Sequence, residues 1–361
     1  MSSSSTNRSV LIFGGAGFIG SNWADHLLSK TDANVHILDN LSRAKVENNI
    51  RWLRSRRGAA SRLKITVADI RDARSVAKAV NGASEIYHFA AQVAVTTSLE
   101  DPRTDFEVNA GGTLNILEAA RQSGNRPFVL FTSTNKVYGK LGAEQDGPSK
   151  LRCTSESQPL DFYSPYGCSK GTADQYVHDY GRIFGIPTVV FRMSCIAGPR
   201  QFGNEDQGWV AHFVYSALQG RTISIYGDGH QVRDVLAVRD LVRAFAAARE
   251  NHKTTGGQVY NIGGGAANTI SLLELVKTLE RALRVPVRIR FRPARPGDQP
   301  IYVTDFGKFR EHTRWEPERS VQQTVHDIRQ WYEENQALFV PTPFRVPSGK
   351  LPTEIVREIA S

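Results

Sequence analysis

Short apolar runs alternate with amphipathic stretches along the first half of the chain. The apolar runs predict β-strands over residues 10–13, 35–39, 63–67, 85–90, 128–132 and 188–192. Helical stretches lie between them, for example over residues 75–80 and 111–123. Regular alternation of strands and helices is typical of a doubly wound parallel sheet, because parallel strands need long crossover connections. We therefore predict an α/β fold with a Rossmann-like domain over residues 9–192.

The second half follows a less regular pattern. Amphipathic helices are predicted over residues 209–218 and 272–283, and joints rich in glycine and proline separate the segments around them. This pattern predicts a smaller C-terminal α/β lobe, mainly residues 193–335, with some crossing of the chain between the two parts. Residues 1–8 are predicted to be a disordered leader, and residues 336–361 an irregular proline-rich tail.

The charge of the chain suits an anionic partner. The 361 residues carry a formal net charge of +9, and five arginines cluster between positions 51 and 62. Such a cluster can attract nucleic acid, but no nucleic-acid motif accompanies it, so a solvated arginine-rich helix is favoured. Positive charge equally suits a small anionic substrate.

Neither a membrane span nor a metal site is predicted. No apolar run reaches the roughly 18 residues that span a bilayer, and the leader lacks the apolar stretch of a signal peptide. Cys153, Cys168 and Cys195 show neither even pairing nor metal-ligand spacing, which predicts free thiols in a reducing cytoplasm. No His-x-x-x-His or His-Glu-x-x-His pattern occurs, so no catalytic metal is expected.

A glycine-rich turn joins the first predicted strand to the first predicted helix. Gly14, Gly17 and Gly20 are spaced G-x-x-G-x-x-G, with Phe18 and Ile19 between the last two. Such glycines permit a tight turn and let backbone N–H groups approach a pyrophosphate at the helix N-terminus. The strand-turn-helix context favours a dinucleotide site over a plain loop.

Residues at the ends of the next strands extend the predicted cofactor site. Asp39 lies 19 residues after Gly20, where a carboxylate can bind the ribose hydroxyls of NAD and repel the 2′-phosphate of NADP. Arg43 could serve NADP instead, but the position of Asp39 at the strand end favours NAD. The remaining predicted cofactor contacts are Asn40, Ser42, Asp69, Ile70, Phe89, Ala90 and Ala91, and the last five can equally be ordinary turn chemistry.

A tyrosine and a lysine are spaced to share one face of a helix. Tyr166 and Lys170 stand four residues apart, and Thr134 follows a strand from which its hydroxyl can be brought alongside. A free tyrosine has a pKa near 10, and a neighbouring lysine cation favours the phenolate. Together the three side chains can exchange a proton with an alcohol, although an isolated Tyr-x-x-x-Lys is more often a solvated helix face.

The glycine turn, Asp39, Thr134 and Tyr166-x-x-x-Lys170, in this order, resemble the extended short-chain dehydrogenase/reductases that modify nucleotide sugars, over residues 9–335. The resemblance implies that Thr134, Tyr166 and Lys170 are catalytic and that Lys170 also binds the nicotinamide ribose of NAD. It implies a nucleotide-diphosphate sugar as substrate, bound mainly by the C-terminal lobe. It further implies a homodimer or homotetramer formed through two helices, here over residues 111–122 and 166–184.

The two residues after Thr134 restrict which reactions of this family the chain is expected to catalyse. Sugar 4,6-dehydratases of this family carry Asp-Glu there, and decarboxylases place a glutamate in the same stretch. The Asp-Glu pair supplies the acid and base for elimination of water, whereas this chain has Asn135-Lys136, which cannot provide two carboxyls. The reactions that remain are redox-only, chiefly epimerisation.

Finer resemblance points to a group of epimerases that invert C2 of a CDP-linked 3,6-dideoxyhexose. The stretches that carry it are residues 92–98, 133–139, 164–171, 200–202, 207–210 and 231–235. A UDP-sugar 4-epimerase, a non-epimerising oxidoreductase and a non-catalytic dinucleotide-binding protein remain alternatives. Cys195 stands where many 4-epimerases carry asparagine.

Arginines in the second half are candidates for the substrate phosphates. Arg233 and Arg295 match family positions that contact the diphosphate, and the planar guanidinium suits phosphate oxygens. Each could instead form a structural ion pair, with Asp234 or Asp298 as its partner. The complete set of predicted substrate contacts is Gln92, Thr134, Asn135, Arg200, Gln201, Arg233, Arg295 and Asp298.

Overall fold

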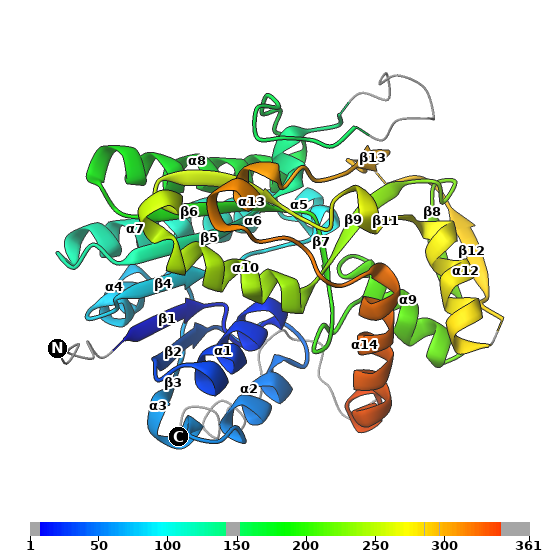
Figure 1. Cartoon of the computed structure of the whole chain (residues 1–361), viewed down its shortest axis with the longest axis horizontal. Coiled ribbons are helices and arrows are strands. Elements are labelled where there is room, and N and C mark those ends of the chain that lie inside the picture. The colour runs from blue at the N-terminus through cyan, green and yellow to red at the C-terminus, as the bar shows by residue number, and fades with distance from the viewer. Residues whose placement is uncertain (1–7, 142–151, 285, 296, 341–361) are drawn as a thin grey trace.

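The computed structural model describes residues 8–141, 152–284, 286–295 and 297–340, and a seven-stranded parallel sheet organises the N-terminal part (Figure 1). The strand order is β10-β6-β5-β4-β1-β2-β3, which confirms the predicted doubly wound α/β fold. The strands are β1 (Ser9–Phe13), β2 (Asn34–Asp39), β3 (Leu63–Val67), β4 (Glu85–His88), β5 (Phe128–Thr134), β6 (Thr188–Met193) and β10 (Gln258–Ile262).

Helices cover both faces of this sheet, and the alternation along each strand explains how. On β1, Val10 and Ile12 belong to one hydrophobic cluster, whereas Leu11 and Phe13 belong to another. The first cluster is closed by α1 (Phe18–Lys30), α2 (Val46–Arg54), α10 (Val238–Glu250) and α13 (Gly307–Thr313). The second is closed by α4 (Ala73–Val80), α7 (Gly112–Gln122) and α8 (Ser164–Phe184), so both faces of the sheet are buried, as parallel sheets require.

The C-terminal lobe has two small sheets and a core of its own. β7 (Cys195–Ala197), β9 (Val232–Ala237), β11 (Thr269–Ser271) and β13 (Ile301–Tyr302) form one sheet, and β8 (Ile223–Tyr226) pairs with β12 (Ile289–Arg292). Their core is closed by α9 (Trp209–Leu218), α12 (Leu272–Leu283), α14 (Val321–Glu334) and the 3₁₀ turn Gln336–Phe339. Because α10 and β10 return to the large sheet, the chain crosses between the two parts.

Short segments between β4 and β5 support one side of the site. These are α5 (Val95–Glu100), α6 (Pro102–Phe106) and the π-helical turn Glu107–Gly111, and all three pack against α8. β4 ends at His88, two residues before the predicted end of this strand, so residues 89–91 form a loop at the sheet edge.

The arginine cluster is partly structural, which the sequence did not predict. It is divided between α2 and α3 (Ala59–Arg62) rather than forming one helix. Arg62 donates to the Leu28 and Thr31 carbonyls at 2.6 and 2.7 Å, and so satisfies the C-terminal end of α1. Arg56 pairs with Asp25 at 2.5 Å.

Two predictions fall largely outside the described residues, namely the leader up to residue 7 and the tail from residue 341. In the described part of the chain, no helix is long and apolar enough to cross a membrane.

Candidate active site

A cavity of about 400 Å³ lies at the carboxyl ends of β1, β4, β5 and β6, between the large sheet and the C-terminal lobe. Ligands of open α/β sheets bind at this edge, because loops from several strands converge there. The predicted site residues that line the cavity are Phe18, Ile19, Phe89, Ala91, Thr134, Asn135, Tyr166, Lys170, Gln201, Arg233, Arg295 and Asp298.

Tyr166 and Lys170 lie in the first two turns of α8 and are both buried. The Lys170 Nζ donates to the Thr132 carbonyl at 2.8 Å and lies 4.1 Å from the centre of the Phe131 ring. Burial lowers the pKa of Lys170 to about 7, although the charges of Asp174 and Asp105 oppose this. The lysine is therefore held against the end of β5 and is easily deprotonated.

Burial also sets the protonation of Tyr166. It raises the pKa of this phenol to about 12; hydrogen bonding to Thr134 lowers the pKa, and the charge of Asp105 raises it. The sequence argument expected the Lys170 cation to lower this pKa. In the chain without cofactor this expectation is wrong, because a lysine with a pKa of about 7 is uncharged at the pH where Tyr166 ionises.

Buried polar residues from α5, α6 and the π-helical turn fix the start of α8. The Ser98 hydroxyl accepts from the Tyr166 backbone N–H at 3.1 Å. The Ser169 hydroxyl donates to Asp105 at 2.5 Å and accepts from Asn109 at 3.0 Å. These contacts were not predicted from the sequence, because nothing local to the residues signals that α6 and the π-helical turn pack against a helix about 60 residues away.

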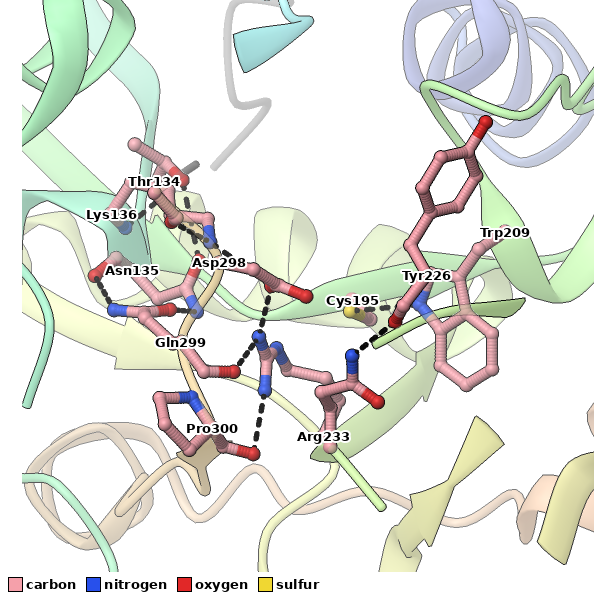
Figure 2. Close-up of polar contacts among 12 residues, drawn as sticks. Thr134, Asn135, Lys136, Cys195, Trp209, Tyr226, Arg233, Asp298, Gln299 and Pro300 are labelled. Atoms are coloured by element: carbon pink, nitrogen blue, oxygen red, sulfur yellow. Dashed lines mark hydrogen bonds and ion pairs between the residues drawn. The ribbon is translucent and has the colours of Figure 1, made fainter. Parts of the chain in front are cut away.

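Thr134 ends β5, and its neighbours form a polar wall of the cavity (Figure 2). Its hydroxyl donates to the Asn135 Oδ1 at 3.4 Å and accepts from the Lys136 backbone N–H at 3.3 Å. The Lys136 Nζ donates to the Gly297 carbonyl at 3.2 Å and lies 3.8 Å from Asp298. Burial, with the charge of Arg233, lowers the pKa of Lys136 to about 8. Lys136 lines the cavity but was not among the predicted site residues.

The glycine turn is shaped to receive a dinucleotide. Gly14 has a φ of +77°, and a Cβ there would lie 2.6 Å from the Ala90 backbone nitrogen. A Cβ on Gly20 would lie 2.6 Å from the Gly15 Cα, so α1 starts directly against the turn. These contacts leave space only for hydrogen at Gly14 and Gly20, so the turn is tight and α1 packs closely against it, as a dinucleotide-binding turn requires, which fits NAD.

The acidic residues of the predicted cofactor site brace this turn. Asp39 accepts from the Ala16 and Leu41 backbone N–H groups at 3.0 and 2.8 Å, and burial raises its pKa against these bonds and the charge of Arg43. Each carboxylate oxygen keeps a further lone pair for a ribose hydroxyl. The Asn40 amide donates to Asp69 at 3.0 Å and its Oδ1 accepts from the Ser42 N–H at 3.1 Å.

Four of the predicted cofactor and substrate contacts lie elsewhere. The Ile70 side chain packs in the core against Gly112. Ala90 packs against Gly14, and neither it nor Gln92 and Arg200 lines the cavity. The Gln92 amide is turned onto its own loop, where it donates to the Ala94 carbonyl at 2.9 Å. The Arg200 guanidinium stacks on the Trp52 ring at 3.3 Å, because the loop that carries it packs against α2. In the substrate-free chain Gln92 and Arg200 thus have partners within the protein, and their contact with substrate stays a prediction.

Both candidate phosphate-binding arginines already have partners within the chain. Arg233 donates to Asp298 at 2.7 Å and to the Gln299 carbonyl (Figure 2), whereas Asp234 accepts from Ser194 at 2.6 Å instead. Arg295 donates to the Glu205 carbonyl at 2.9 Å and stacks on Tyr226 at 3.7 Å. The structural ion pair considered for Arg233 is present, with Asp298 as the partner.

A further polar group at the Arg295 end of the cavity was not predicted. The Tyr226 and Ser224 hydroxyls donate to Glu205 at 3.0 and 3.1 Å, and Asp206 lies 3.3 Å from Arg295. Nearby, the Trp209 indole N–H donates to the Cys195 sulfur at 3.3 Å. These residues come from β7, β8, α9 and two loops, and only the folded lobe brings them together.

A dinucleotide turn and a buried tyrosine–lysine pair facing one cavity define an enzyme of the short-chain dehydrogenase/reductase type. The model of the GDP-mannose 4,6 dehydratase family matches residues 11–328, and the chain belongs to this family of enzymes that act on nucleotide sugars.

Individual relatives and solved structures of this kind are similar to the chain over most of its length. CDP-paratose 2-epimerase from Salmonella typhi is 41% identical over 337 residues, which cover 89% of this chain and 98% of the relative. A dTDP-glucose 4,6-dehydratase from Streptomyces venezuelae, solved with NAD bound, has a TM-score of 0.80 and 30% identity, over 91% of this chain and 98% of that one. UDP-glucose 4-epimerase from Thermus thermophilus, solved in complex with NAD, has a TM-score of 0.78 and 31% identity, over 91% and 99%.

Proposed function

We propose that this chain is an NAD-dependent nucleotide-sugar epimerase that inverts C2 of a CDP-linked 3,6-dideoxyhexose, as in the conversion of CDP-paratose to CDP-tyvelose. The observation that carries this proposal is the polar wall beside Tyr166. Where the elimination enzymes of this family carry two carboxyls, this wall has Asn135 and Lys136. The similarity to CDP-paratose 2-epimerase supports C2 as the carbon and CDP as the nucleotide.

The carboxylates that line the described cavity are engaged elsewhere. Asp298 pairs with Arg233, Asp206 with Arg295, and Glu205 accepts from Tyr226 and Ser224. None of the three is placed beside Thr134 as a free acid or base. A reaction that needs only a proton acceptor and a redox cofactor fits this arrangement better than loss of water or carbon dioxide does.

In the proposed mechanism, the Tyr166 phenolate accepts the proton of the substrate hydroxyl at the reacting carbon. Thr134 turns its hydroxyl from the Asn135 oxygen, 3.4 Å away, to the same substrate oxygen and stabilises its developing charge. Lys170 holds the end of β5 in place and, when charged, favours the phenolate. Bound NAD supplies a reversible hydride acceptor at this carbon. The oxidised sugar then turns to present its other face, and Tyr166 returns the proton as reduction inverts the centre.

The direct test is incubation with a panel of CDP-, UDP-, GDP- and dTDP-sugars in deuterated water. We expect a C2 epimer of a CDP-sugar without solvent deuterium at the inverted carbon, because the abstracted hydride returns to it. A C4 epimer of a UDP-sugar would identify a 4-epimerase instead. Stoichiometric consumption of reduced nucleotide would identify a net oxidoreductase, and deuterium at the inverted centre would indicate carbanion chemistry.

We also propose that the chain forms a homodimer or homotetramer through α7 and α8. Apolar side chains are exposed along α8, with Ile183 at 67% and Tyr176 at 45% of full exposure, and Phe106 on the neighbouring α6 is 57% exposed. Such a patch is typical of an interface between subunits.

The three cysteines are free thiols, which supports a reducing cytoplasm as the site of action.

A further inference from the structure

A buried glutamine outside the cavity is bonded to the residue next to Thr134 (Figure 2). Gln299, in the C-terminal lobe just before β13, is only 1% exposed and does not line the cavity. Its Nε2 donates to the Gly139 carbonyl at 2.6 Å and to the Asn135 carbonyl at 3.4 Å. Its Oε1 accepts from the Asn135 Nδ2 at 3.0 Å. A residue 164 positions away in the sequence therefore contacts the wall beside the candidate catalytic hydroxyl.

These contacts leave one orientation for both amides. Backbone carbonyls only accept, so the end of Gln299 that faces Gly139 must be its NH₂ group. The Gln299 oxygen then faces Asn135, which must present its own NH₂ group. The Asn135 oxygen is thereby turned to Thr134, whose hydroxyl donates to it at 3.4 Å. The buried glutamine thus determines which hydrogen-bonding role the Thr134 hydroxyl plays.

The same segment is held at its other end by a cation of the cavity. Arg233 donates to the Gln299 backbone carbonyl and, at 2.7 Å, to Asp298. The Arg233 side chain is 10% exposed and lines the cavity as a candidate for the substrate diphosphate. One continuous set of hydrogen bonds therefore runs from Arg233 through Gln299 and Asn135 to Thr134.

We propose that Gln299 is a positioning residue that couples the anion-binding end of the cavity to the Thr134 hydroxyl through the Asn135 amide. This inference rests on the proposed function, which gives Arg233 and Thr134 their roles. It also explains why an amide stands at position 135. An ionised carboxylate there could not donate to the Gln299 oxygen, and the Gly139 carbonyl prevents the glutamine from turning its NH₂ group to meet it.

The test compares kcat, KM for the CDP-sugar and Kd for CDP in the NAD-bound wild type, Gln299→Leu and Gln330→Leu. Gln330 is an exposed amide on α14 that pairs with Glu334, so its variant controls for loss of a glutamine. For Gln299→Leu we expect kcat to fall on the order of 10- to 100-fold. KM and Kd should stay within about threefold, because the substrate contacts remain. A kcat per NAD-bound site within about twofold of wild type would overturn the proposal.

Gln299→Glu provides a second variant of the same shape. The introduced carboxyl can donate to Gly139 only when protonated, and burial raises its pKa. The charged groups on the neighbouring segments are Arg233, Lys136, Asp298 and Asp161, the last of which lies against Gly139. We expect the ratio of variant to wild-type kcat to rise as the pH falls. A ratio that does not change with pH would contradict the proposal.

A readout that needs no turnover separates this inference from the proposed function. If the wild type epimerises no nucleotide sugar, the proposed function fails, and the amide pair is tested by melting temperatures of the NAD-bound protein. Asn135→Ala, Gln299→Leu and the double variant then form a cycle. If the two amides bond to each other, the melting temperature of the double variant should fall by less than the sum of the two single decreases. Additive decreases would show that the two amides do not interact.

Discussion

Burial controls the protonation of three ionisable side chains that line the cavity. Tyr166, Lys170 and Lys136 all have pKa values shifted towards their neutral forms, to about 12, 7 and 8. Neutral side chains are the expected state at buried positions, because desolvation disfavours each charge. An anionic substrate adds its own charge to the cavity and so changes the pKa values of these three groups.

Replacing Tyr166 by phenylalanine should remove the proton acceptor and leave the cavity intact. Turnover should fall about 10³-fold, the usual scale for a lost general base, while the bound NAD content stays unchanged. Epimerisation rates and nucleotide released on denaturation measure the two effects. Tyr176→Phe, an exposed position on the same helix, is the matched control. Unchanged turnover in Tyr166→Phe would remove this tyrosine from the mechanism.

Lys170 should make the stability of the cofactor-free chain depend on pH. Its pKa is about 7 in the folded state and near 10.5 when unfolded, so between these values only the unfolded state binds the proton. The free energy of unfolding should therefore rise with pH across this window, by at most about 1.4 kcal/mol per pH unit from this group.

Urea unfolding of the wild type and of Lys170→Met at several pH values tests this. The variant should show a smaller rise, while the contribution of Lys136, from pH 8 to 10.5, remains in both proteins. An equal rise of the free energy of unfolding with pH in the two proteins would show that Lys170 is not the group that titrates.

At the scale of single elements, the turn between β1 and α1 depends on two glycines for different reasons. Gly14 adopts a left-handed φ and lies against the loop after β4, whereas Gly20 lets α1 begin against the turn. The strand, turn and helix form a local unit, so its pattern could be read from the sequence before any tertiary contact was known.

Gly20→Ala should displace the start of α1 and weaken NAD binding. The new Cβ would lie 2.6 Å from the Gly15 Cα, and overpacking of this kind costs about 1–3 kcal/mol. Bound NAD content and the melting temperature of the variant measure the loss. Gly111→Ala, whose Cβ would meet only the Phe106 carbonyl at 4.0 Å, is the control and should change stability by about 1 kcal/mol or less. Full NAD content in Gly20→Ala would contradict this account of the turn.

At the scale of the whole molecule, α8 links the proposed chemistry to assembly. Its buried face carries Tyr166 and Lys170, and its exposed face carries Tyr176, Ile183 and Phe184. A subunit packed on the outer face would hold the helix that positions the tyrosine.

Ile183→Glu should therefore dissociate the proposed oligomer, since a carboxylate would be buried at the interface. Light scattering after size-exclusion chromatography measures the mass, and we expect a monomer. Phe291→Glu changes another exposed apolar residue, on β12, and should leave the assembly intact. If Phe291→Glu dissociated the oligomer and Ile183→Glu did not, the interface would lie on the C-terminal lobe instead.

The sequence by itself determined the features that depend on neighbours along the chain. Apolar runs predicted six strands of the large sheet, and the α9 and α12 boundaries agree with the predicted helices. The glycine turn and the spacing of Tyr166 and Lys170 are likewise local patterns. The Asn135-Lys136 pair restricted the expected reaction without any structure, because it shows directly that the two carboxyls of the elimination enzymes are missing.

Only the tertiary structure decided which distant residues meet. Arg233 pairs with Asp298 rather than with its neighbour Asp234, because successive residues of β9 point to opposite faces and β13 lies alongside. Gln299 reaches Asn135 across 164 residues, and Asp105 reaches Ser169 across 64. Burial, which sets the protonation of Tyr166 and Lys170, is also a property of the packed molecule. No local pattern contains these facts, since they depend on how whole elements pack.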